Sequence, residues 1–156
     1  MSNGSVLIDT NLLLLLIVGL CDKNIICDHK RTKNFTVADY DLLVSQIDGF
    51  SSIWVTSHCL AEVSNLLKQT HKQQGKQLLS CLSTFVDRAH ESHISKVNIF
   101  KNEAYLSLGV SDTGIIQKSK RVSCVYTVDL DLYLRISRLG RKVINFNHLR
   151  NQILLA

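Results

Sequence analysis

Four acidic residues, scattered over most of the chain, stand where the expected secondary structure changes. Asp9 ends a first strand, and Glu62 lies in the second turn of the helix after a second strand. Asp112 opens a later helix, and Asp129 follows the strand to which that helix leads. Two like charges about 4 Å apart repel by roughly 4 kcal/mol at an effective dielectric near 20. If these carboxylates meet, they need a cation or protons to neutralise them.

Carboxylate oxygens favour particular ions and hence particular chemistry. Oxygen-only ligands select hard ions, Mg²⁺ or Mn²⁺, over zinc. Such ions bridge phosphate oxygens and can generate hydroxide for in-line attack on a phosphodiester. A site made of these four acids is therefore expected to hydrolyse phosphodiesters.

The elements that must position these acids are predicted by apolar patterning. Short apolar runs alternate with helical patterns, which indicates an α/β fold: a three-layer α/β/α sandwich with a mainly parallel central sheet. The expected strands are Ser5–Asp9, Ile53–Thr56, a short one at Ile94–Val97, Val122–Thr127 and Lys142–Phe146. The expected helices are a Leu-rich one ending near Gly19, one capped by Thr36, one capped by Ser57, Lys72 to about Ser92, Ile99–Leu108, Ser111–Lys118, Leu130–Leu139 and a short C-terminal one. The polar stretch 22–34 is expected to be an exposed loop.

A parallel sheet brings distant residues to one edge. Its crossover helices start at the edge where the strands end, and ligands of open α/β sheets bind there. Asp9, Glu62, Asp112 and Asp129 are therefore all predicted on one rim. Each acid alone has a structural explanation, since carboxylates near helix N-termini contribute about 0.3–1 kcal/mol and Asp is a common cap. Their coincidence on one rim is harder to explain in that way.

Length and composition bound the remaining possibilities. The 156 residues are expected to form a single domain, residues 1–156, because domains commonly run roughly 100–200 residues. Five cysteines without a CxxC pair fit a reducing compartment. The apolar stretch Leu12–Leu20 is shorter than the about 20 residues that a membrane span needs, and Met1–Ser5 lacks the positive charge of a signal peptide. We therefore expect a cytoplasmic protein with no membrane partner.

The charge balance favours a polyanionic partner. The net charge is +5, and without the four acids nine acidic residues remain against 18 Lys and Arg, a balance of +9. A negative pocket within a positive surface suits cleavage of a nucleic acid. The residues that could supply this surface are Lys23, Lys30, Arg31, Lys33, Lys118, Lys120, Arg121, Arg135, Arg138, Arg141 and Lys142.

Four ordered segments carry a resemblance to a known family. They are VLIDTN (Val6–Asn11), SHCLAEVSNLL around Glu62, LGVSDTGII (Leu108–Ile116) and TVDLDLY (Thr127–Tyr133), and KVINF resembles a closing strand. Together they resemble the PIN-domain nucleases, the superfamily that includes the toxin ribonucleases of bacterial type II toxin–antitoxin pairs. Thr113 and Gly114 depart from the family's Ala-rich helix start, and loop 22–34 has no clear counterpart.

The resemblance implies a set of roles. Asp9, Glu62, Asp112 and Asp129 would be the catalytic acids that bind Mg²⁺ or Mn²⁺, with Asn11, Thr127 and Asp131 as auxiliary residues. The implied activity is metal-dependent endoribonuclease cleavage of tRNA, mRNA or rRNA by a metal-activated water. A toxin of this type would form a homodimer and bind an antitoxin protein.

Two other functions stay open at this point. A catalytically silent PIN scaffold would use the basic surface to bind RNA or a protein partner. A phosphotransfer domain of the receiver or haloacid-dehalogenase type would use Asp9 as the phosphorylated nucleophile, although Asn11 stands where the dehalogenases carry a second acid. His58, Asn65 and His148 are weaker candidates for substrate contact.

Overall fold

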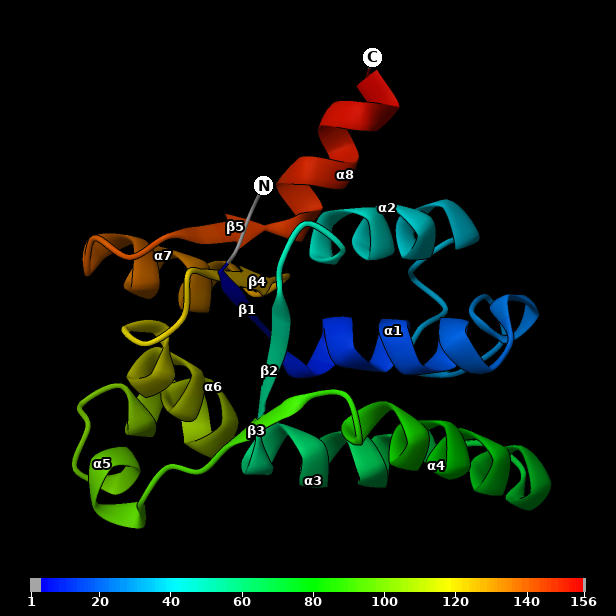
Figure 1. The fold of residues 1–156 in the computed structure, drawn as a ribbon, viewed down its shortest axis with the longest axis horizontal. Helices are drawn as coiled ribbons and strands as arrows, with labels where there is room; N and C mark the ends of the chain where they lie inside the picture. The colour runs from blue at the N-terminus through cyan, green and yellow to red at the C-terminus, as the bar shows by residue number, and fades with distance from the viewer. Residues whose placement is uncertain (1–3, 156) are drawn as a thin grey trace.

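The computed structural model describes residues 4–155 and forms a five-stranded, all-parallel sheet between helices (Figure 1). The strand order is β3-β2-β1-β4-β5. The strands are β1 (Ser5–Ile8), β2 (Ser52–Thr56), β3 (His90–Ser92), β4 (Cys124–Thr127) and β5 (Val143–Asn145). The helices are α1 (Thr10–Cys21), the 3₁₀ turn η1 (Lys23–Ile25), α2 (Val37–Ile47), α3 (Ser57–Leu67), α4 (Lys72–Val86), α5 (Lys96–Phe100), α6 (Tyr105–Ser119), α7 (Leu130–Arg138) and α8 (Phe146–Leu155). The expected α/β/α sandwich is confirmed.

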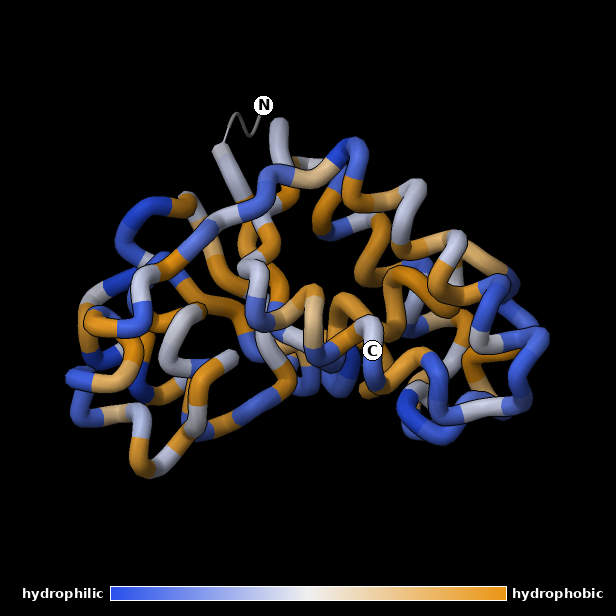
Figure 2. The backbone as a smooth tube through the Cα atoms, turned by 90° about the horizontal axis from the view of Figure 1, so that it is seen from below, coloured by the Kyte–Doolittle hydropathy of each residue, from blue (hydrophilic) through white to orange (hydrophobic). Residues whose placement is uncertain are grey.

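Alternation along β1 separates the core into two layers. Val6 and Ile8 pack in one hydrophobic cluster with α1, α2 and α4, whereas Leu7 packs in a second cluster with α6 and α7. The same alternation holds in β4, because successive side chains of a strand point to opposite faces. In Figure 1, α1, α2 and α4 lie on one side of the strands and α5, α6 and α7 on the other. Figure 2 shows hydrophobic stretches running through the interior and hydrophilic ones mainly along the outer loops.

Helix α1 is apolar on every side because it is covered on every side. Residues Leu12–Val18 are all at most 2% exposed. A helix that is hydrophobic all round belongs in a core rather than on a surface. The expected Leu-rich helix is therefore part of the core, and no helix within residues 4–155 is long and apolar enough to cross a membrane.

The predicted position of the edge strand β3 is wrong. The helix expected from Lys72 to about Ser92 ends at Val86, and the strand lies at His90–Ser92 rather than at Ile94–Val97. An edge strand pairs on one side only, and β3 has the polar sequence HES, so it lacks the apolar pattern that identifies a strand. The His90 ring instead lies 4.1 Å from that of Trp54 on β2.

Two helix starts also differ from expectation. Helix α3 is capped by Thr56, whose hydroxyl accepts the Cys59 N–H, and not by Ser57. The helix expected at Ile99–Leu108 is divided into α5 and the first turn of α6. Helix α6 then continues through a kink at Gly109, whose φ of 82° suits glycine.

The stretch 22–34 is largely exposed, as expected, but buried residues within it anchor its backbone. His29 is 2% exposed, and its Nδ1 accepts the Arg31 backbone N–H at 3.1 Å. The proton is therefore on Nε2, which lies 3.1 Å from the Leu67 carbonyl of α3. Thr32 is fully buried and donates to the Ile26 carbonyl at 2.8 Å. The basic side chains of this segment thus stand on an anchored backbone.

Candidate active site

The carboxyl ends of β1 and β4 form the centre of the site. The chain runs from β1 outward to β2 and β3, then crosses to β4 and β5 on the other side of β1. The strand order therefore reverses between β1 and β4, and such a switch point is where open α/β sheets bind ligands. Asp9 directly follows β1, and Asp129 comes two residues after β4.

Asp9 is buried, and its carboxylate accepts three hydrogen bonds. Its Oδ1 accepts the Leu12 N–H at 2.9 Å and so caps α1. Its Oδ2 accepts the Thr127 hydroxyl at 2.6 Å and the Val128 N–H at 2.9 Å, which ties the end of β1 to the end of β4. Burial raises the pKa of Asp9, these three hydrogen bonds oppose the rise, and the negative charge of Asp129 adds to it.

Asp129 is held by the same arrangement. Its backbone N–H donates to the Thr127 hydroxyl at 2.9 Å, and its Oδ1 caps α7 by accepting the Leu132 N–H at 2.9 Å. Thr127 thus contacts Asp9 through its hydrogen and Asp129 through its lone pair. One hydroxyl fixes the spacing between the two strand ends.

Glu62 is brought to this rim from α3. Its Oε2 accepts the Ser111 hydroxyl of α6 at 2.5 Å and lies 3.5 Å from the hydroxyl of Thr10, the residue after Asp9. Hydrogen bonds from two other helices therefore hold this exposed carboxylate toward Asp9 and Asp112.

Asp112 owes its position to the kink in α6. Because Gly109 breaks the helical backbone, Asp112 lies in the first turn of the segment that follows. Burial above all, and then the negative charges of Asp129, Asp9 and Glu62 in that order, raise the pKa of Asp112 to about 7. All four predicted acids are therefore close enough to interact at one place.

Among the described residues, no basic side chain forms an ion pair with the four acids. Within residues 4–155, the ion pairs are Lys23–Asp41 and Arg150–Asp39, and neither involves the four acids. In the same part of the chain, no three His, Cys, Asp or Glu side chains are already arranged to hold one metal ion. The donor set is nevertheless made of oxygen alone, which suits a hard divalent ion.

Of the three predicted auxiliary residues, Thr127 lies in the site, and Asn11 and Asp131 are exposed. Thr127 is fully buried at the centre of the site. Asn11 is exposed in the first turn of α1. Asp131 is exposed in the first turn of α7 and lines a neighbouring pocket instead of joining the four acids.

Sequence reasoning missed the hydroxyls that orient the acids. Thr10 follows Asp9, Ser111 precedes Asp112, and both hydroxyls contact Glu62. Their position next to a predicted acid is the feature of the sequence that could have identified them. Two buried polar atoms near the rim, His58 Nδ1 and Thr113 Oγ1, have no hydrogen-bond partner among the described residues. Thr113 directly follows Asp112, and His58 precedes Glu62 by one helical turn.

Replacing Thr127 by valine is expected to destabilise the protein by about 1–3 kcal/mol, because the Asp129 N–H and Asp9 Oδ2 both lose a partner in a buried place. Urea unfolding measures this change. Thr127→Ser keeps the hydroxyl and serves as the control, since it should retain most of the stability. Equal stability of Thr127→Val and the wild type would contradict the bridging role.

Comparison with known proteins leaves the site to be interpreted from its own chemistry: no family model matches this chain, and a search of curated proteins finds no match.

Proposed function

We propose that this protein is a metal-dependent endoribonuclease of the PIN type, which hydrolyses RNA phosphodiester bonds at the acidic rim. The observation that carries the proposal is the convergence of Asp9, Glu62, Asp112 and Asp129: burial raises the pKa of Asp112, and the negative charges of the other three acids add to the rise. A protein has little use for crowded, unpaired carboxylates unless a cation joins them. The ordered segments that resemble PIN nucleases support the same proposal.

The residues have distinct tasks in this proposal. Asp9, Asp112 and Asp129, completed by Glu62, would hold Mg²⁺ or Mn²⁺. When bound, the ion neutralises the carboxylates and activates a water for attack on the phosphodiester. Thr127 and the Val128 N–H fix the Asp9 carboxylate, and Ser111 and Thr10 orient Glu62. No side chain forms a covalent intermediate.

Cleavage of a fluorescently labelled single-stranded RNA, followed on a denaturing gel, tests this function. We expect cleavage with Mg²⁺ or Mn²⁺ and none in excess EDTA, because the four acids supply no positive charge of their own. Restoring the ion after EDTA should restore the activity. Cleavage that persists without a divalent ion would contradict the proposal.

A silent scaffold that binds RNA or a protein remains the second candidate. The observation favouring it is that no three of these side chains are pre-arranged around one ion within residues 4–155. Calorimetric titration of metal-free protein with Mn²⁺ separates the two functions. A nuclease should bind the ion with measurable affinity, whereas a silent scaffold should not.

The resemblance extends the proposal to a cytoplasmic toxin of a toxin–antitoxin pair, acting as a homodimer and inhibited by an antitoxin protein. Its substrate would be tRNA, mRNA or rRNA. Growth arrest on expression of the wild type, but not of Asp112→Asn, would support the toxin role.

A further inference from the structure

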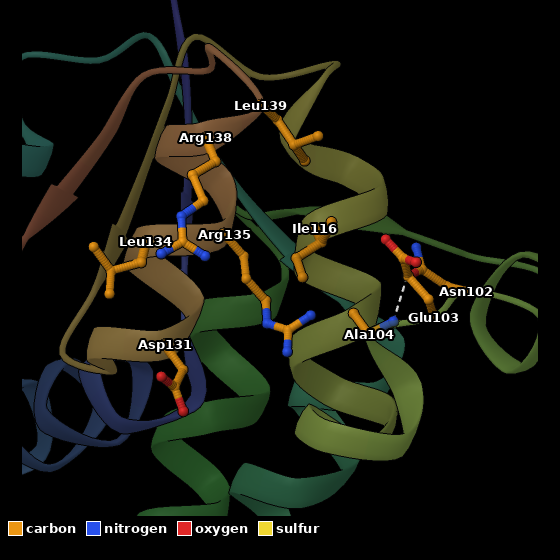
Figure 3. Close-up of a pocket in the computed structure, with 9 residues that line it drawn as sticks. All are labelled: Asn102, Glu103, Ala104, Ile116, Asp131, Leu134, Arg135, Arg138 and Leu139. Atoms are coloured by element: carbon orange, nitrogen blue, oxygen red, sulfur yellow. Dashed lines mark hydrogen bonds between the residues drawn. The ribbon is translucent and has the colours of Figure 1, made fainter.

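A pocket of about 400 Å³ lies between α7, α6 and the segment that precedes α6 (Figure 3). Helix α7 begins directly after Asp129, and Asp131 in its first turn already lines the pocket. Asp131 therefore brings one side of the pocket to the end of α7 at which the acidic rim lies, whereas Arg135, Arg138 and Leu139 line it toward the other end. The pocket is lined by Asn102, Glu103, Ala104, Ile116, Asp131, Leu134, Arg135, Arg138 and Leu139.

Two arginines of the pocket have unused donors. Arg135 and Arg138 stand one helical turn apart on α7, and neither makes a side-chain hydrogen bond or an ion pair with any residue in the described range 4–155. Arg135 extends from α7 toward α6 (Figure 3). Arg141, by contrast, donates to the Ile116 carbonyl at 2.8 Å and the Ser119 hydroxyl at 2.7 Å, and so holds the fold. Both arginines lie in the last turn of α7, where a cation suits the negative end of the helix dipole.

The pocket holds both signs of charge, which favours one kind of ligand. Arg135 and Arg138 donate in the geometry that phosphate oxygens accept. Glu103 and Asp131 add two carboxylates, which can accept hydrogen bonds from hydroxyl groups. An RNA strand carries a phosphate and a ribose 2′-hydroxyl on each nucleotide, and the 2′-hydroxyl is the group that distinguishes RNA from DNA. A ribose–phosphate backbone therefore matches the pocket better than a simple anion does.

We propose that this pocket is a backbone subsite for the single-stranded RNA substrate. Phosphates of the strand bind Arg135 and Arg138, and ribose hydroxyls donate to Asp131 and Glu103. Arg135 and Arg138 are six and nine residues beyond Asp129, about 9 and 14 Å along the helix axis. A single strand can therefore reach them while another of its phosphodiesters lies at the acidic rim. This proposal rests on the proposed nuclease function, because that function places the cleaved bond.

Fluorescence anisotropy of a labelled single-stranded RNA, measured with the full chain in EDTA, tests the subsite without cleavage. The double variant Arg135→Ala, Arg138→Ala should weaken RNA binding about tenfold or more at low salt. It should also reduce the slope of log affinity against log salt by about 1.4, since each lost phosphate contact on a single strand contributes roughly 0.7.

Two controls make this binding test specific. The double variant Lys76→Ala, Arg88→Ala removes the same charge from exposed positions on and just after α4, which packs on the other side of the sheet from α7. It should leave the affinity within about twofold of the wild type. Asp131→Ala should reduce binding of RNA but not of DNA of the same sequence, because only RNA offers the 2′-hydroxyl.

The outcomes separate this inference from the function on which it rests. Equal loss of affinity in Arg135→Ala, Arg138→Ala and in Lys76→Ala, Arg88→Ala would show a diffuse basic surface and overturn the subsite. An unchanged preference for RNA in Asp131→Ala would overturn the ribose contact. Wild-type cleavage with unaffected binding in Arg135→Ala, Arg138→Ala would reject the subsite while keeping the nuclease. Arginine-dependent RNA binding without any cleavage would keep the subsite and reject the nuclease.

Discussion

Asp112→Asn is expected to make the metal-free protein more stable at pH 8 while RNA cleavage falls about a hundredfold or more. The activity is lost because the variant removes a ligand of an ion that supplies several kcal/mol of transition-state stabilisation. The stability rises because the variant removes a carboxylate whose charge the folded state disfavours. Opposite changes in stability and activity are typical of a residue kept for function.

The pH dependence of this effect follows from the raised pKa. The pKa of Asp112 rises from 3.8 to about 7 on folding, so between these values the folded protein holds a proton that the unfolded chain releases. The free energy of unfolding therefore falls as the pH rises through this range, and the penalty is complete above about pH 7. Burial raises the pKa of Asp9 as well, which contributes with the same sign.

Thermal unfolding in EDTA between pH 5 and pH 8 measures this dependence. The wild type should lose stability across the range, and Asp112→Asn should lose less, so that the two differ most at pH 8. Asp87→Asn, at an exposed position at the end of α4, is the matched control and should follow the wild type. Saturating Mn²⁺ should stabilise the wild type, by about 2.7 kcal/mol at a concentration 100 times the dissociation constant. A wild type whose stability is unchanged over this range would contradict the crowded site.

Asp9→Asn is expected to abolish cleavage and, unlike Asp112→Asn, to lower stability. Asn keeps one acceptor oxygen for the Leu12 N–H, but its amide nitrogen cannot accept the Val128 N–H. A buried donor left without a partner costs about 1–3 kcal/mol, although removal of the buried charge offsets part of this. We expect a folded protein of reduced stability with no measurable activity.

Circular dichroism and urea unfolding establish the fold and stability of Asp9→Asn before its activity is assayed. Asn11→Ala provides a neighbouring control, because Asn11 is exposed and belongs to the same motif. It should keep the stability of the wild type. Wild-type cleavage by pure Asp9→Asn that EDTA does not inhibit would end the proposal that the acidic rim is the active site.

The gathering of the acids at one edge of the sheet could be predicted from the sequence because it follows from the parallel topology. Asp9 and Asp129 follow strongly apolar strands, and a parallel sheet must place the ends of such strands together. The positions of Glu62 and Asp112 follow from the same rule, since crossover helices start at that edge. The kink at Gly109 could be anticipated because glycine disrupts helices, and its positive φ accounts for it.

The sequence by itself determined the layers, the parallel sheet and the rim on which the acids stand, because periodicity and strand order depend on local patterns. Only the tertiary structure decided where β3 lies, since a polar edge strand is selected by its pairing with β2 and the contact between Trp54 and His90. It alone revealed that Thr127 joins Asp9 to Asp129 and that Ser111 and Thr10 hold Glu62. It also distinguished Arg141, which holds the fold, from Arg135 and Arg138, whose donors have no partner within residues 4–155. Hydrogen bonds between residues far apart in the chain depend on side-chain distances that no local pattern encodes.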